Sequence, residues 1–165
     1  MLNLEDYGFT SSMMPEDTDG IPARVTAVHK ERYELICEYG YIFGRLKSSI
    51  YYFGGLEAFP TTGDFVLIDY NPRGDSLIIK TLKRKSFFSR RDPLPGRGEQ
   101  AVAANFDYVF IMQSLNYDFN LKRMERYVTL AWQSGAVPVV ILTKADLVDD
   151  YSEQMLAAQR VAAGI

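Results

Sequence analysis

The segment Val137–Leu147 reads VPVVILTKADL, and it decides how the second half of the chain folds. Its first six residues are apolar without alternation, which is typical of a parallel β-strand covered on both faces. Polar residues follow at once, at Thr143, Lys144 and Asp146. Because ligands of open α/β sheets bind beyond the carboxyl ends of the strands, these three side chains are candidates for contact with a ligand.

The chemistry of these three residues favours a guanine base. The carboxylate of Asp146 can accept hydrogen bonds from both the N1–H and the exocyclic amine of guanine, a donor pair that adenine lacks. The stem of Lys144 can lie along the flat face of the base while its ammonium stays near solvent. Thr143 stands where such motifs usually have Asn, and a hydroxyl replaces only part of the bonding of an amide. The alternative is a polar loop after a core strand, with Asp146 capping the next helix.

Strand and helix patterns alternate around this segment. An apolar strand is predicted over 106–112 and a helix over 121–133, with Asn120 as its cap and with Met124 and Trp132 facing the core. The order of elements is therefore that of an α/β domain.

The last predicted helix covers 152–163, where Asp149 and Asp150 complement its dipole and Gly164 caps its end. Two strands with two helices leave sheet edges exposed. We therefore expect the chain to be the front part of a longer protein that continues inside its second domain.

The first half of the chain is β-rich. An aromatic stretch containing Tyr51, Tyr52 and Phe53 interrupts it, and these rings are interpreted either as a stacking surface for bases or as a plug under a barrel. Five short strands favour a small Greek-key barrel of the OB type, and an SH3-like barrel with the same strand count is the alternative. The predicted strands cover 21–29, 31–39, 41–46, 64–70 and 77–82.

Cysteine and histidine are too scarce to organise the chain. With one of each among 165 residues, the sequence supports neither an internal disulfide framework nor a Cys/His metal cluster. Cys37 is expected to lie in a strand with its side chain facing the protein core, and His29 is expected to lie at the end of a strand. The amino terminus lacks a basic start followed by an apolar run, so we expect no signal peptide and a cytoplasmic location.

A strip of basic residues interrupts an otherwise acidic chain. Between Lys80 and Arg97 there are seven basic residues and one acidic residue, a net charge of +6 against −3 for the whole chain. Such a strip favours a defined contact with a polyanion, and the alternative is a solvated linker. With two residues near the end of the third predicted strand, it supplies the nucleic-acid-binding candidates: Arg45, Lys47, Lys80, Lys83, Arg84, Lys85, Arg90 and Arg91.

Residues 86–104 are predicted to form a basic linker, because prolines and glycines gather at their centre. Gly96 and Gly98 are interpreted as hinge residues. No phosphate-loop pattern GxxxxGK[ST] occurs in the sequence, so these glycines are not assigned to phosphate binding.

Taken in order, these motifs resemble the ribosome small-subunit-dependent GTPase A family, also called RsgA, YjeQ or EngC. The resemblance runs over nearly the whole chain, and the opening Tyr7-Gly8-Phe9 and the pair Arg90-Arg91 fit it too. The segments that carry it are QAVAANFDYVFI (100–111), DFN (118–120), ERY (125–127) and VVILTKADL (139–147).

The resemblance implies an amino-terminal OB domain, a circularly permuted GTPase domain of the α/β P-loop type in which the guanine motif precedes the P-loop, and a carboxy-terminal zinc-binding region. It divides the chain into an OB domain at 1–85 that binds RNA and the ribosome, a linker at 86–104 and an incomplete GTPase domain at 105–165. Thr143, Lys144 and Asp146 would select the guanine of GTP or GDP, while phosphates and magnesium would be bound beyond Ile165.

The implied function is late maturation of the small ribosomal subunit, in which the barrel docks on ribosomal RNA. We expect a monomer without membrane contact. Two other interpretations stay open: a freestanding OB-type RNA-binding adaptor without catalysis, and an SH3-like module that binds proteins.

Overall fold

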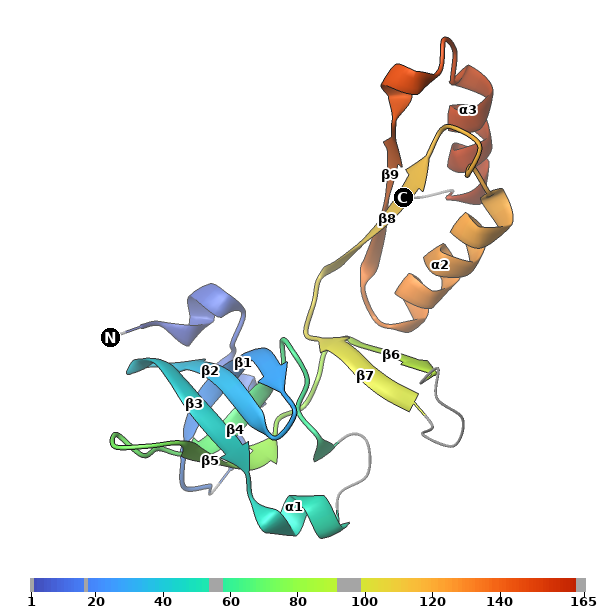
Figure 1. Cartoon of the computed structure of the whole chain (residues 1–165). Helices are drawn as coiled ribbons and strands as arrows, with labels where there is room; N and C mark the ends of the chain where they lie inside the picture. Colours follow the sequence, from blue (N-terminus) through green and yellow to red (C-terminus); the bar gives the residue numbers. More distant parts are fainter. Residues whose placement is uncertain (1, 17, 54–57, 92–98, 163–165) are drawn as a thin grey trace. The chain divides into compact units, whose positions relative to one another are not determined.

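The computed structural model describes residues 2–16, 18–53, 58–91 and 99–162, with only the backbone for residues 51–53 and 91. The chain forms two compact units, residues 1–105 and 106–165, each described here by itself (Figure 1). The expected roles of Gly96, Gly98 and Gly164 lie outside the described residues.

A closed five-stranded barrel dominates the first unit, in the order β1-β2-β3-β5-β4. Strand β5 pairs in parallel with β3 and antiparallel with β4, so the consecutive strands β3 and β4 are not neighbours. This Greek-key closure confirms the OB-type prediction over the SH3-like alternative. The elements are β1 (Ile21–His29), β2 (Arg32–Cys37), β3 (Gly40–Leu46), α1 (Ser48–Phe53), β4 (Phe65–Asp69) and β5 (Ser76–Thr81).

Alternating side chains fill the barrel. In β2, Tyr33, Leu35 and Cys37 face the interior, where all three are buried, as the sequence predicts. His29 ends β1, also as predicted, and its Nε2 lies 2.9 Å from the Glu34 carboxylate.

The N-terminal segment covers part of the barrel's outer surface. It contains the short helices η1 (Leu4–Tyr7) and η2 (Ser11–Met13). Phe9 packs on Phe65 with ring centroids 5.4 Å apart, beside the buried Leu67 and Leu82. This second cluster explains why β4 carries buried apolar residues on both of its faces.

The stretch predicted as a linker instead contains a β-hairpin. Strands β6 (Phe87–Arg91) and β7 (Glu99–Ala104) pair antiparallel with a bulge after Phe88. The sequence pattern misses the pairing because its turn-forming residues lie between the strands, and their composition is also that of a linker.

Hydrogen bonds fasten the base of the hairpin to the barrel. The Ala104 amide donates to the Thr62 carbonyl, and the Asn105 amide donates to Ser86, at 3.0 and 2.9 Å. Asn105 is buried with φ +54°, and its side-chain amide donates to the Gly63 carbonyl at 3.1 Å. A left-handed Asn therefore ends the first unit, and the hairpin belongs to that unit.

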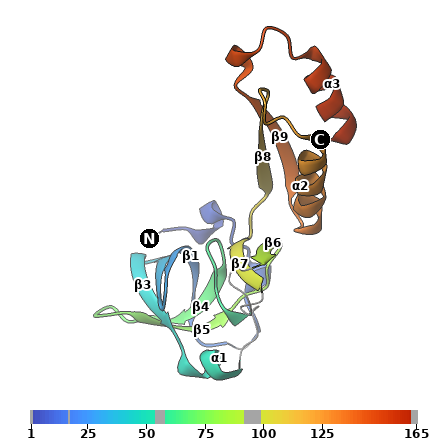
Figure 2. The same ribbon diagram turned by 45° about the vertical axis from the view of Figure 1, so that its right-hand side comes forward.

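The second unit is a parallel strand pair covered by two helices. β8 (Tyr108–Ser114) pairs with β9 (Val137–Thr143) over its full length. Helices α2 (Leu121–Gln133) and α3 (Ser152–Val161) lie on one side of this pair (Figure 2), where Ile111, Met124 and Ala158 are buried together. Among the described residues, no helix combines the length and the apolar character that crossing a bilayer requires.

Helix α2 has the predicted bounds and cap, because the Asn120 side chain accepts a hydrogen bond from the Arg123 amide at 2.9 Å. The expectation that Trp132 faces the core is wrong, since 52% of it is exposed. Met124 is fully buried and Ala131, seven residues on, is nearly so. At about 100° per residue, Trp132 lies about 80° around the helix from Met124, outside that buried stripe.

We expect Gly63→Ala to destabilise the first unit more than Gly8→Ala. Both glycines have positive φ, +90° and +86°, so each alanine incurs a left-handed cost of about 1–2 kcal/mol. Only at Gly63 would the new Cβ overlap a backbone atom, the Ala104 carbonyl oxygen; at Gly8 no heavy atom lies within 4 Å. Urea unfolding followed by circular dichroism measures both losses, and equal losses would contradict this close approach.

Candidate guanine-recognition loop and basic barrel surface

The loop after β9 places the predicted guanine-binding residues at one edge of the sheet. Thr143 is the last residue of β9, and its carbonyl accepts from the Leu115 amide at 3.0 Å. Lys144 follows in the left-handed conformation, with φ +59° and ψ +37°. The short helix η4 (Ala145–Leu147) then carries Asp146, and both charged side chains are exposed.

The neighbouring strand adds polar groups at the same edge. After β8, the Arg123 guanidinium bonds both carboxylate oxygens of Asp118 at 3.0 and 2.8 Å, and the buried Gln113 donates to the Asp118 carbonyl at 2.6 Å. The hydrogen bond from Arg123 is the main cause that lowers the pKa of Asp118, and the charge of Lys144 adds to it. Lys144 is thus electrostatically coupled to this cluster.

Asn116 is a residue that the sequence analysis missed. Its Oδ1 is buried and has no hydrogen-bond partner among the described residues. The signal was its place a few residues after the predicted strand 106–112. An unsatisfied buried acceptor requires a partner such as water.

The loop presents an exposed carboxylate and an exposed lysine at the carboxyl edge of a parallel pair, which is where ligands of open α/β sheets bind. Within the described ranges, no group of three or more His, Cys, Asp or Glu side chains is arranged to hold an ion.

Some basic candidates in the first unit have exposed side chains, and others are paired with carboxylates of the barrel. Lys47, Lys80 and Lys83 are exposed, and so is Lys85. The Lys47 amide donates to the Ile78 carbonyl at 3.0 Å, two residues before Lys80, so two neighbouring strands carry cations toward the same end of the barrel.

In the hairpin, Arg90 is exposed and lies within 3.4 Å of the Gln100 amide oxygen, while the side chain of Arg91 lies outside the described residues. The side chains of Tyr51, Tyr52 and Phe53 also lie outside them.

Arg84 has a structural role instead of the expected free charge. Its Nε and Nη2 bond the two carboxylate oxygens of the fully buried Asp64 at 2.7 and 2.6 Å. Nη2 also donates to the Phe59 carbonyl at 3.0 Å, and the guanidinium lies 4.3 Å from the Phe87 ring centroid. Only 11% of the Arg84 side chain is exposed, so this cation is not available to a phosphate.

Arg45 shares a carboxylate with a residue that the sequence analysis did not select. Its Nε donates to one oxygen of Asp75 at 2.7 Å, and Arg32 donates to the other oxygen from Nε and Nη2. Both arginine side chains keep about half or more of their surface exposed, at 66% and 47%. Alternation of Tyr41, Phe43 and Arg45 along β3 was the signal that this face points outward.

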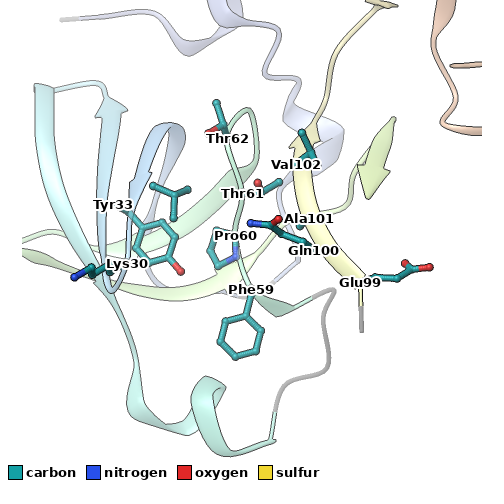
Figure 3. Close-up of a pocket in the computed structure, with 11 residues that line it drawn as sticks. Lys30, Tyr33, Phe59, Pro60, Thr61, Thr62, Glu99, Gln100, Ala101 and Val102 are labelled. Carbon is teal, nitrogen blue, oxygen red and sulfur yellow. The ribbon is translucent and has the colours of Figure 1, made fainter. Parts of the chain in front are cut away.

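A cavity of about 630 Å³ lies between the barrel and β7 (Figure 3). Tyr33, Pro60 and Gln100 are among the residues that line it, and Lys30 and Glu99 lie toward opposite ends in this view. Lys30 and Glu99 carry opposite charges and the other lining residues are neutral, so the lining has no net charge that would favour an anion.

Comparison with known proteins identifies relatives along the whole chain. The family model "RsgA GTPase" matches residues 81–165. A protein of Listeria monocytogenes called "Small ribosomal subunit biogenesis GTPase RsgA 1" is 44% identical over 164 residues, which cover 98% of this chain and 46% of that protein. A Mesorhizobium japonicum protein of the same kind, RsgA, is 36% identical over 96% of this chain and 45% of its own length. The chain spans about half the length of these curated relatives.

Two solved structures share the fold. YloQ, described as a circularly permuted GTPase, aligns with a TM-score of 0.64 and 15% identity over 88% of this chain and 48% of its own. YjeQ from Thermotoga maritima aligns with a TM-score of 0.63 and 19% identity, covering 82% of this chain and 45% of its own. They confirm the expected succession of a barrel and the first elements of a circularly permuted GTPase domain.

We expect Arg84→Ala to destabilise the protein by about 3–5 kcal/mol, because it leaves the buried Asp64 carboxylate without its cation. Arg90→Ala, which removes an exposed arginine with one long contact to Gln100, serves as the matched control and is expected to cost much less. Urea unfolding of both variants checks this. A loss for Arg84→Ala no larger than that for Arg90→Ala would show that the buried pair does not stabilise the fold.

Proposed function

The chain belongs to the RsgA GTPase family, and we propose that it is the front part of a ribosome-biogenesis GTPase that binds the small ribosomal subunit and assists its late maturation. The observation that carries the proposal is the Thr143–Asp146 loop at the carboxyl edge of a parallel strand pair, in the same chain as an OB-type barrel with exposed lysines.

In this proposal the loop after β9 selects guanine. Asp146 accepts from the base, Lys144 lies along its face, and Thr143 orients the loop as the last residue of β9.

Phosphate and magnesium chemistry are assigned to other parts of the protein. Phosphoryl transfer depends on positioning and on charge stabilisation around the γ-phosphate. The sequence contains no phosphate-loop pattern, and the chain covers 46% of the Listeria monocytogenes relative, so we propose that the phosphate and magnesium sites of GTP or GDP lie beyond Ile165. A zinc-binding region there is proposed from the family resemblance alone.

The barrel unit supplies the contact with ribosomal RNA. Lys47, Lys80 and Lys83 are exposed cations on or beside β3 and β5, where phosphates can reach them. Because the hairpin is fastened to the barrel, we extend the RNA-binding unit from residue 85 to 105. The protein is proposed to act as a monomer in the cytoplasm, where ribosomal subunits mature.

We expect the Lys47→Glu/Lys80→Glu/Lys83→Glu variant to lose salt-sensitive co-sedimentation with purified small ribosomal subunits. Each phosphate contact contributes about −0.7 to the slope of log affinity against log salt on single strands, so losing three flattens the slope by about 2. Lys122→Glu/Arg126→Glu/Arg160→Glu, with the same charge change on exposed positions of the second unit, is the control. Equal loss in both variants would mean that only net charge matters and would contradict a barrel contact.

We expect this chain alone to release no phosphate from GTP, because the loop after β9 holds a base but not the reacting phosphates. The measurement is phosphate release by the purified chain beside its Asp146→Ala variant. Turnover that Asp146→Ala abolishes would belong to this chain and would overturn the assignment of the phosphate site beyond Ile165.

A further inference from the structure

The cavity of about 630 Å³ beside the barrel follows the edge of strand β7 (Figure 3). Four consecutive residues of this strand, 99–102, line it, and residues 59–62 form the opposite wall. Because successive side chains point to opposite faces of a strand, a cavity that touches four in a row runs along the edge of the strand, beside its backbone. We call the space between these two walls the β7 groove.

The backbone of β7 is hydrogen-bonded on one side only. The strand pairs with β6, and the two form a sheet of their own. On the other side, Ala104 donates to the Thr62 carbonyl at the base of the hairpin. Among the described residues, no backbone hydrogen bond joins residues 99–102 to the barrel. An unpaired edge presents a row of backbone donors and acceptors, and these are a template for another strand.

The opposite wall does not complete this edge, because its own backbone groups are largely bonded elsewhere. The Thr61 amide donates to the Asp64 carboxylate at 2.8 Å, and the Thr61 carbonyl accepts from the Asp64 amide at 3.0 Å. The Thr62 carbonyl accepts the bond at the base of the hairpin, and Pro60 has no N–H to donate. A strand added to the groove would therefore pair with β7 alone and pack its side chains on this wall.

The lining indicates the chemistry of such an occupant. Lys30 and Glu99 carry opposite charges and the other lining residues are neutral, which favours a segment without net charge over a polyanion. Tyr33 and Pro60 are buried and Val102 is 40% exposed, so aliphatic side chains find apolar contacts there.

The length of the edge limits the segment that it can hold. Val102 is the extra residue of the β-bulge, so the regular part of the edge covers residues 99–101. Three residues of a strand extend about 10 Å, which matches a segment of three or four residues.

We propose that the β7 groove binds a short extended segment of a partner protein, which pairs with the edge of β7 as the third strand of the β6–β7 sheet. The segment has no net charge and carries aliphatic side chains at alternate positions. This mode of recognition combines main-chain hydrogen bonds with contacts to alternate side chains. The inference goes beyond the proposed function, because it assigns a peptide-binding site to the hairpin that requires neither nucleotide nor RNA.

The probes are two fluorescein-labelled hexapeptides with blocked ends, KVTVTE and ETVTVK, which together cover both directions of pairing. Fluorescence anisotropy with the whole chain is expected to show saturable binding of at least one, with a Kd below about 1 mM. At saturation, amide hydrogen exchange of residues 99–102 is expected to slow by at least about fivefold, because new backbone hydrogen bonds protect these amides. The same peptide methylated at its backbone nitrogens keeps its side chains but loses its donors, and is expected to bind at least about tenfold more weakly.

Val102→Asp tests the position of the site, because it places a charge where the segment would pack. We expect at least about fivefold weaker binding of the peptide by this variant. Val137→Asp is the matched control, because Val137 is a strand valine of similar exposure, 43%, in the second unit. It is expected to bind like the wild type. Circular dichroism with an unchanged unfolding midpoint shows that both variants are folded, and the methylated peptide decides the question if Val102→Asp is not.

Four outcomes would overturn the inference. The first is no saturable binding of either peptide, and the second is equal binding of the methylated peptide. The third is protection of residues 99–102 by a 12-nucleotide oligouridine while the peptides are inert, which would assign the groove to nucleic acid. The fourth is protection that rises with protein concentration in the absence of peptide, which would make the occupant a second copy of this chain.

Discussion

The buried ion pair of Asp64 and Arg84 is the interaction on which the first unit depends. The carboxylate is fully buried and accepts three hydrogen bonds, one from the Thr61 amide and two from the guanidinium. Arg84 in turn reaches the Phe59 carbonyl and the Phe87 ring. One desolvated pair thus connects the turn before β4 to the start of the hairpin, and removing either partner leaves an uncompensated charge inside the protein.

Local sequence patterns predicted the elements well and the long-range pairings poorly. Helix α2 and strand β9 follow from an Asn cap, helical periodicity and an apolar run, all contained within a few residues. The hairpin of β6 and β7 is also held to the barrel by hydrogen bonds to Thr62 and Gly63, about 40 residues away, and no local pattern encodes these contacts. Composition alone therefore indicated a linker where the chain forms a hairpin.

The candidate sites show the same division. The guanine-type loop is a local motif, so its residues could be proposed from the sequence alone, and the structure adds the left-handed Lys144 that turns the chain after β9. Arg32 was missed because its two partners, Phe43 and Asp75, lie 11 and 43 positions away. Arg84 was selected for its charge, because its buried partner Asp64 could not be identified without the fold.

The barrel therefore contains two different kinds of arginine–carboxylate pair, one buried and one exposed. Arg84 forms a bidentate pair with the buried carboxylate of Asp64, and little of the Arg84 side chain is exposed to solvent. Its positive charge is therefore neutralised inside the fold. At Asp75 one carboxylate serves two arginines, and about half or more of each arginine side chain remains exposed to solvent. Counting basic residues treats these cases alike. Burial of the carboxylate and exposure of the guanidinium distinguish an arginine whose charge is enclosed by the fold from one whose charge faces solvent.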